Sequence, residues 1–274
     1  MNRTAFLIFC CLLIIQFKTE SAISQSDIAK ESQSPIGKLT SLSFQNDMLF
    51  GVGLEEELAY SLRTGLIFPV NLGDRVDLIN RWFMPFVFQE ASFPDDTNKV
   101  GLSDLNIQTL LTPSEPKWFL WGELKWALGT SVYLPTNTND DLGTDKVSIG
   151  PILAFVREPK ALVYGFLIQN VWSVAGDEDE PDVNEMILQY FLNYNFKNGW
   201  YLTSSNFITA NWKEDNDNRW TVPIGGGVGK IIRTKRRHLD FRAQTYWLVE
   251  KPQFAPDWGL QLTVKWLFTR NFLK

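Results

Sequence analysis

Ten charged side chains share one face of a series of alternating segments, and they form the first candidate site. Apolar and polar residues take turns in these segments, which gives a β-strand one apolar and one polar face because side chains on a strand repeat every two residues. If the polar faces enclose one interior, the charges would form the rings or pairs that set the selectivity of a pore. The alternative is that they pair with one another and fill a narrow interior, because buried charge needs a partner. The ten are Arg63, Asp77, Arg81, Asp104, Glu123, Lys125, Glu185, Asp240, Arg242 and Lys265.

His238 is the single histidine and the candidate for an enzymatic site. A hydrolase with a Ser–His pair would need this histidine beside a serine. His238 ends the basic turn 233–238, which is typical of a solvated charge cluster, so we predict no catalytic residue. A catalytic zinc site of the usual type would lack ligands, because the only cysteines, Cys10 and Cys11, stand near the start of the chain.

Two further motifs suggest ligand sites. The glycine-rich stretch 225–230 lacks the glycine spacing and the Ser or Thr of a phosphate loop, and a strand pattern runs through it. Gly225, Gly227 and Gly229 would face the interior, where glycine marks curvature or the close approach of another segment. The acidic segment 176–182 could hold calcium weakly through Asp177, Asp179 and Asp182, because calcium takes six to eight oxygen ligands. We otherwise predict no metal and no cofactor.

About twelve strands position these residues. The hairpin formed by 186–196 and 200–212 is the clearest, because its turn contains Asn198-Gly199, a strong hairpin signal. From Trp200 to Trp212 the second arm spans roughly 40 Å, or about 30 Å at a tilt of about 40–45°, which suits the ~25 Å apolar band and aromatic girdles of an outer-membrane barrel. Strands of soluble sandwiches are usually about half as long. The predicted strands are 36–46, 60–70, 76–88, 103–111, 120–134, 147–157, 162–175, 186–196, 200–212, 220–232, 239–249 and 258–268.

The connections between these segments give independent support. Long acidic connections (47–57, 90–99, 137–145, 176–182, 213–218 and 250–257) alternate with short ones (71–74, 113–117, 158–160, 196–199 and 233–238). Outer-membrane barrels have short periplasmic turns, longer outer loops and an even strand number, which puts both termini in the periplasm. The sequence therefore predicts an all-β fold: a single closed antiparallel transmembrane β-barrel of about 12 strands. Its aromatic girdle would contain Trp82, Trp126, Trp200, Trp212, Trp220, Trp247, Trp258 and Trp266.

Composition and the first residues agree with this fold. Arg3 followed by the apolar segment 5–17 and the small residues at 22–24 predict a signal peptide over 1–24. A polar, mobile tail is expected over 25–35, and the barrel over 36–274. Subtracting Arg3, Lys18 and Glu20 leaves 24 basic and 30 acidic side chains, a balance of −6 that argues against nucleic-acid binding. The 11 Trp, 20 Phe and 7 Tyr are many for a soluble domain, and aromatic residues gather at membrane interfaces.

Several stretches resemble a bacterial outer-membrane barrel family named for the meta-pathway of phenol degradation, whose members are often labelled transporter or neuromedin U. The most specific is 188–205 (LQYFLNYNFKNGWYLTSS). The chain end differs from the family pattern, because Thr269-Arg270 follow Leu267-Phe268 where Pro-Lys would be expected. The resemblance implies a barrel that passes small hydrophobic or aromatic molecules, and it carries over no defined site. The other matching stretches are 104–113, 134–136, 142–144, 150–151, 172–184, 220–230 and 267–268.

The function expected from these observations is passage of small molecules across the outer membrane. The alternatives are an outer-membrane hydrolase of the phospholipase type, and a closed structural or surface-binding barrel. The expected partners are outer-membrane lipid and lipopolysaccharide, periplasmic chaperones, the barrel-insertion machinery and an unidentified solute.

Overall fold

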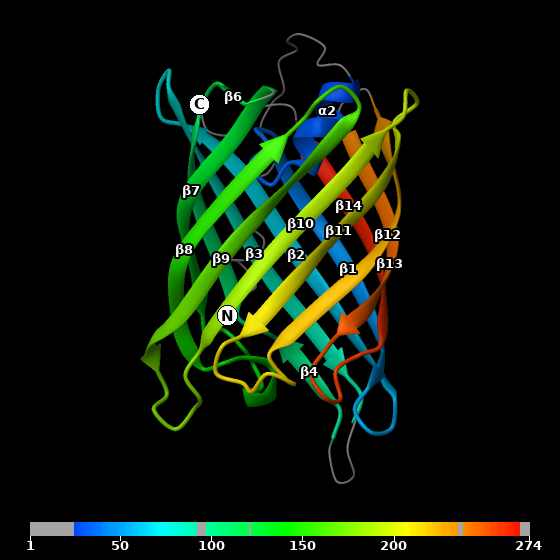
Figure 1. Cartoon of the computed structure of the whole chain (residues 1–274). Helices are drawn as coiled ribbons and strands as arrows, with labels where there is room; N and C mark the ends of the chain where they lie inside the picture. Colours follow the sequence, from blue (N-terminus) through cyan, green and yellow to red (C-terminus); the bar gives the residue numbers. More distant parts are fainter. Residues whose placement is uncertain (1–24, 92–96, 121, 235–237, 269–274) are drawn as a thin grey trace, which may run out of the picture.

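The computed structural model describes residues 25–91, 97–120, 122–234 and 238–268, so the predicted signal peptide lies outside the described residues. Twelve long antiparallel strands form one closed barrel (Figure 1). The ring closes where β1 pairs with β14, from Thr40 opposite Phe268 to Phe50 opposite Trp258. The prediction of a single closed antiparallel barrel of about twelve strands is therefore confirmed.

The twelve strands of the ring run over nine to fifteen residues each. They are β1 (Thr40–Val52), β2 (Glu57–Asn71), β3 (Val76–Gln89), β5 (Leu105–Pro113), β7 (Gly122–Leu134), β8 (Lys146–Arg157), β9 (Leu162–Gly176), β10 (Asn184–Asn195), β11 (Trp200–Asn211), β12 (Trp220–Arg233), β13 (His238–Glu250) and β14 (Trp258–Phe268). Two short strands extend it: β4 (Lys99–Leu102) pairs with β3, and β6 (Lys117–Phe119) pairs with β7. A 3-10 turn, η1 (Asp140–Leu142), lies between β7 and β8.

The strands separate an exposed apolar exterior from an interior whose side chains are buried within the protein. In β8, Ile149 and Leu153 on the outer face are 40% and 38% exposed, whereas Ile152 and Ala154 on the inner face are fully buried. An apolar face is stable on the outside only if lipid covers it, so this exterior is that of an outer-membrane barrel. The register around Asn170, which the sequence leaves ambiguous, puts Asn170 on the outer face, next to the indole of Trp212.

The first strand differs from its prediction. It covers Thr40–Val52 rather than 36–46, and it therefore takes up half of the connection expected at 47–57. The alternation continues past Asn46, because Met48 and Phe50 follow Leu42 and Phe44 on the same face. Phe50 stacks on Trp258 with ring centroids 4.2 Å apart, which anchors this end of the strand.

The segment expected to be a mobile polar tail is instead the helix α2 (Gln25–Gln33). It lies at the end of the barrel that carries the short turns and the end of β14 (Figure 1). Ile28 and Ala29 of this helix are 1% and 3% exposed, so barrel side chains cover them. None of the helices within the described ranges is long and apolar enough to cross a membrane.

Placing a charge on the outer face should destabilise the barrel. Leu153 lies near the middle of β8, and the change Leu153→Arg should cost about 2–4 kcal/mol of unfolding free energy because arginine at the bilayer midplane loses its water. Urea unfolding in lipid vesicles would measure this. The control is Leu54→Arg in the connection after β1, where Leu54 is 57% exposed and the cost should be close to zero. Equal stability of the two variants would contradict a lipid-facing exterior.

Candidate functional site

A cavity of about 90 Å³ lies inside the barrel, directly behind the end of α2. Its wall is built from the N-terminal segment and from seven strands, β1, β2, β3, β10, β11, β13 and β14. The charged groups that line it are four cations and one carboxylate: Arg63, Arg81, Arg242, Lys265 and Asp240. Half of the ten charged residues that the sequence places in the interior therefore meet at this one site.

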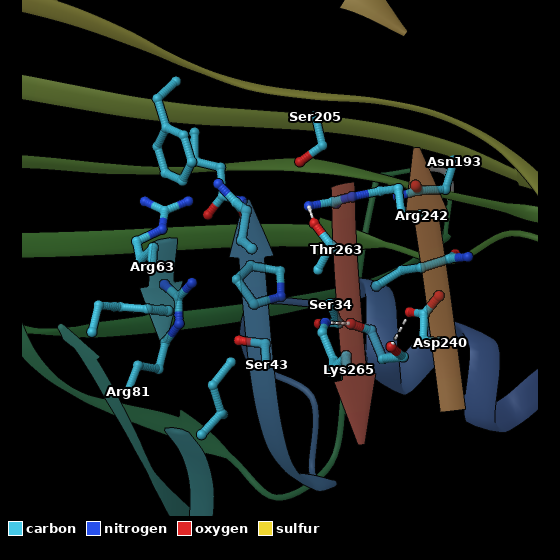
Figure 2. Close-up of a pocket in the computed structure, with 18 of the residues that line it drawn as sticks. Ser34, Ser43, Arg63, Arg81, Asn193, Ser205, Asp240, Arg242, Thr263 and Lys265 are labelled. Atoms are coloured by element: carbon cyan, nitrogen blue, oxygen red, sulfur yellow. Dashed lines mark hydrogen bonds between the residues drawn. The ribbon is translucent and has the colours of Figure 1, made fainter. Parts of the chain in front are cut away.

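Two of the cations share an aromatic surface. Arg63 from β2 and Arg81 from β3 lie side by side in Figure 2. Both guanidinium groups lie over the Phe83 ring, with the guanidinium carbon of Arg63 at 5.6 Å and that of Arg81 at 5.1 Å from the ring centre. Arg63 also lies 4.6 Å from the centre of the Phe207 ring. Contact with the ring faces stabilises the charges without neutralising them.

The arginines keep unused hydrogen-bond donors. Arg81 donates to Gln108 Oε1 at 2.8 Å, and Arg242 donates to Gln261 Oε1 at 2.9 Å. Within the described part of the chain, neither guanidinium forms an ion pair, and the buried Nε atoms of both have no hydrogen-bond partner. Buried donors without acceptors are costly, so the cavity has unmet capacity for an anion.

The single carboxylate is already satisfied. Asp240 accepts a hydrogen bond from Ser32 Oγ at one oxygen and from Tyr201 OH at the other, each at 2.6 Å. Lys265 Nζ donates to the backbone carbonyl of Ser32 at 2.7 Å. Asp240 and Lys265 therefore fix the end of α2 in place, and they leave the arginines as the charges that face open space.

The helix α2 packs against the barrel wall at the end behind this cavity. Its apolar residues Ile28 and Ala29 pack into a buried cluster with Tyr201 of β11, Ile231 of β12 and Leu267 of β14. Gln33 and Asn195 of β10 exchange a pair of amide hydrogen bonds at 2.8 and 2.9 Å. The helix therefore contacts the wall on several sides of the lumen.

Ion pairs at the rim add to this anchoring. Lys125 lies 2.9 Å from carboxylate oxygens of both Glu31, in α2, and Glu158, in the turn after β8. Lys38, just after the helix, pairs with Asp77 at 2.8 Å. Lys125 and Asp77 thus belong to the anchor of the N-terminal segment rather than to the cavity lining.

The remaining three predicted charges lie elsewhere. Asp104 is buried and accepts hydrogen bonds from Thr144 N and Thr144 Oγ1, both at 2.9 Å, so it holds the connection between β7 and β8. Glu185 follows the first residue of β10, at the barrel end opposite α2, and does not line the cavity. Glu123 is exposed in the small β6–β7 hairpin.

The predicted girdle tryptophans gather mostly at strand ends. Trp212 and Trp220 meet edge to face at 5.6 Å, and Trp247 stands opposite Trp258. Trp200 and Trp126 lie near the other barrel end, as does Trp266, which contacts Phe44 at 5.5 Å. Trp82 lies in the middle of β3 and packs on Phe68.

The alternative sites are poorly formed. His238 is buried rather than solvated, and its Nδ1 atom has no hydrogen-bond partner. In the acidic loop, Asp182 pairs with Lys213 at 3.5 Å, and Asp177 accepts a hydrogen bond from the backbone of Asp179. Across the described ranges, no group of three or more His, Cys, Asp or Glu side chains is arranged to hold a metal.

Comparison with known proteins shows which solved structures share this fold. No family model matches the chain, and no curated protein matches its sequence. Among solved structures, an outer membrane channel from Pseudomonas putida F1 superposes with a TM-score of 0.63 at 14% identity, over 86% of this chain and 97% of that one. The NanC porin superposes with a TM-score of 0.53 at 10% identity, over 84% of this chain and 100% of that one. These likenesses establish the shared barrel fold.

Sequence reasoning missed the N-terminal contribution to the site. Ser32, Gln33, Ser34 and Pro35 form one wall of the cavity, yet their neighbours along the chain show no strand pattern. The available signal was the pair Ile28-Ala29, two apolar residues in an otherwise polar segment.

Loosening α2 should open the barrel. The change Ile28→Asp buries a carboxylate in an apolar cluster and should cost about 3 kcal/mol of docking free energy, roughly a hundredfold in the docking equilibrium. Single-channel recording in planar bilayers should show a larger conductance or longer open times than for the unchanged protein. Ile28→Val keeps the apolar contact and serves as the matched control. Identical recordings for both variants would mean that α2 does not obstruct the lumen.

Proposed function

We propose that this protein is a passive outer-membrane channel for small molecules and that its lumen favours anions. The observation that carries the proposal is the cavity on the barrel interior, where four cations face one carboxylate that is already hydrogen-bonded. Charged groups at a narrow point of a lumen set which ions enter it. The structural neighbours support the same class of function, because one is described as an outer membrane channel and another as a porin.

Membership of the phenol meta-pathway family is part of this proposal. The sequence stretches that resemble the family and the likeness to an outer membrane channel point the same way. The aromatic side chains Phe83 and Phe207 beside the arginines would suit a solute that carries both a negative group and an apolar ring.

The docked helix defines a closed or narrow state. With α2 seated, the cavity is bounded on one side by Ser32 to Pro35, so a solute can leave by this end only if the segment shifts. The ion pairs of Glu31 and Lys38 lie at the rim, where side chains of Lys125 and Lys38 are 23% and 42% exposed. The partner carboxylates of Glu31 and Asp77 are only 23% and 7% exposed, so these pairs are partly buried, and movement of the helix requires both of them to separate.

Ion selectivity tests the proposal directly. Reversal potentials in a potassium chloride gradient should show a preference for chloride, and the double change Arg63→Ala with Arg81→Ala should lower the chloride-to-potassium permeability ratio several-fold because the lumen loses two positive charges. Arg75→Ala, in the exposed turn before β3, is the control and should leave the ratio unchanged.

The opposite results would reject the proposal. Folded protein that carries no current, with or without the Ile28→Asp change, would favour the closed structural barrel. A current that prefers potassium would reject the role of the arginines while keeping the channel.

A lipid hydrolase is the rival function, and the surroundings of His238 disfavour it. The unpartnered Nδ1 atom means that no acid orients the ring through that nitrogen, as a catalytic histidine requires. Release of fatty acid from phospholipid vesicles with calcium present should therefore stay at the background of protein-free vesicles. Release that disappears on the change His238→Ala would establish the hydrolase instead.

A further inference from the structure

Gln189 of β10 is a polar residue of the cavity lining that has no partner in the wall. Its buried Oε1 atom forms no hydrogen bond within the described part of the chain. The neighbours of Gln189 on the inner face explain this, because all four are apolar. They are Ile187 and Phe191 on the same strand, Leu167 opposite on β9 and Phe207 opposite on β11. None of these side chains can donate a hydrogen bond to the amide.

The arginines of the same cavity have the opposite need. Arg63 and Arg81 both lie over the Phe83 ring, so two positive charges stand close together, and neither forms an ion pair in the described residues. Like charges repel at short distance, whereas a carboxylate placed between them would accept hydrogen bonds from both. The cavity thus offers donors at the arginines and an acceptor at Gln189.

Phe207 sets the distance between these two groups. The Arg63 guanidinium carbon lies 4.6 Å from the centre of the Phe207 ring. Gln189 stands directly opposite Phe207, and paired residues of antiparallel strands have Cα atoms ~4.5–5.5 Å apart with their side chains on the same face. The arginine and the amide therefore flank one aromatic ring. A molecule that reaches both would carry its hydrogen-bond donor a few bonds away from its carboxylate.

The rest of the lining suits a small polar molecule. Ser34 Oγ is another buried group without a hydrogen-bond partner among the described residues. Ser34, Ser205 and Asn193 lie around the same space as the arginines (Figure 2). Buried polar groups without partners are unfavourable, so an occupant with hydroxyl groups gains more here than a hydrocarbon does. A cavity of about 90 Å³ suits an occupant with few carbon atoms.

We propose that this cavity is a binding site for a small hydroxy acid. The carboxylate accepts hydrogen bonds from Arg63 and Arg81, and the hydroxyl group pairs with the amide of Gln189 on the other side of Phe207. A hydroxyl group suits this place because it can both donate and accept, so it satisfies either end of an amide. The inference rests on the proposed channel function for the entry of the acid, and it names the class of anion that the lumen selects.

Two four-carbon acids that differ by a single oxygen atom, 4-hydroxybutyrate and butyrate, test the site. Ligand-detected NMR titration of the purified, folded protein should give a dissociation constant about five-fold lower for 4-hydroxybutyrate, because one hydrogen bond to a buried acceptor is gained. Gln189→Leu should remove this difference and leave the binding of butyrate unchanged. The leucine matches the four apolar neighbours, so the barrel should still fold.

Matched variants locate the effect at this amide. Gln253→Leu removes the same group from the exposed connection after β13 and should keep the preference for 4-hydroxybutyrate. Gln189→Met keeps the unbranched shape of glutamine and should lose the preference, as Gln189→Leu does. Arg63→Ala should weaken the binding of both acids by a similar factor, since it removes a charge that both carboxylates use.

Equal dissociation constants of the two acids for the unchanged protein would overturn the inference, as would a preference that survives both changes at Gln189. Chloride conductance in planar bilayers separates this result from the channel function. A protein that conducts chloride but does not prefer 4-hydroxybutyrate retains the channel and loses the site. A protein that prefers 4-hydroxybutyrate but carries no current retains the site and loses the channel.

Discussion

The structure depends on one constraint: inside a bilayer no water is present to satisfy backbone N–H and C=O groups. The barrel meets it by pairing β1 with β14, so that no strand has a free edge. Every strand then needs an apolar outer face, and whatever remains polar must face the lumen. The position of the arginine cluster is a consequence of this arrangement, because on a strand whose outer face is apolar only the inner face can carry charged residues.

The same constraint explains the side-chain contacts between β11 and β12, whose backbone pairing is interrupted at 204–208 and 222–226. The glycines and proline of β12 remove ladder bonds, and Ser204, Tyr190 and Gln244 supply replacements from three different strands. Asn206 stands at a position of β11 where the alternation points outward, and a polar side chain there would be unfavourable against lipid. Its amide is instead buried within the wall, where it donates to Tyr190 OH and accepts from Gln244 Nε2. Local loss of backbone pairing and local polarity of the wall therefore compensate each other.

The sequence predicts well which face of a strand a side chain lies on, and it predicts poorly the position of that side chain along the barrel axis. A period of two decides whether Arg81 or Trp82 points inward, which is why the barrel, its closure and five charges of the cavity can be anticipated. It does not say how far along the lumen a side chain lies, so Glu123 and Asp104 are predicted in the same lumen-facing set as Arg63, although Glu123 is exposed in a short hairpin and Asp104 holds a connection. The helix α2 could not be predicted from local pattern, since its polar residues are satisfied by partners more than 90 residues away, as in the contacts of Glu31 with Lys125 and of Ser32 with Asp240.

The net charge of a chain is a poor guide to the field inside it. The full chain carries a formal charge of −5, and its acidic residues are concentrated in connections such as 176–182, whereas four cations and one carboxylate line the cavity. At physiological ionic strength the screening length is about 8 Å, so exposed loop charges have little effect deep in the lumen. The wall around the cavity has a low dielectric constant and focuses the field of the arginines along the axis. In the channel that we propose, an anion that passes the acidic loops would meet a positive interior, and the local arrangement of Arg63, Arg81 and Arg242, rather than the overall charge, would set the selectivity.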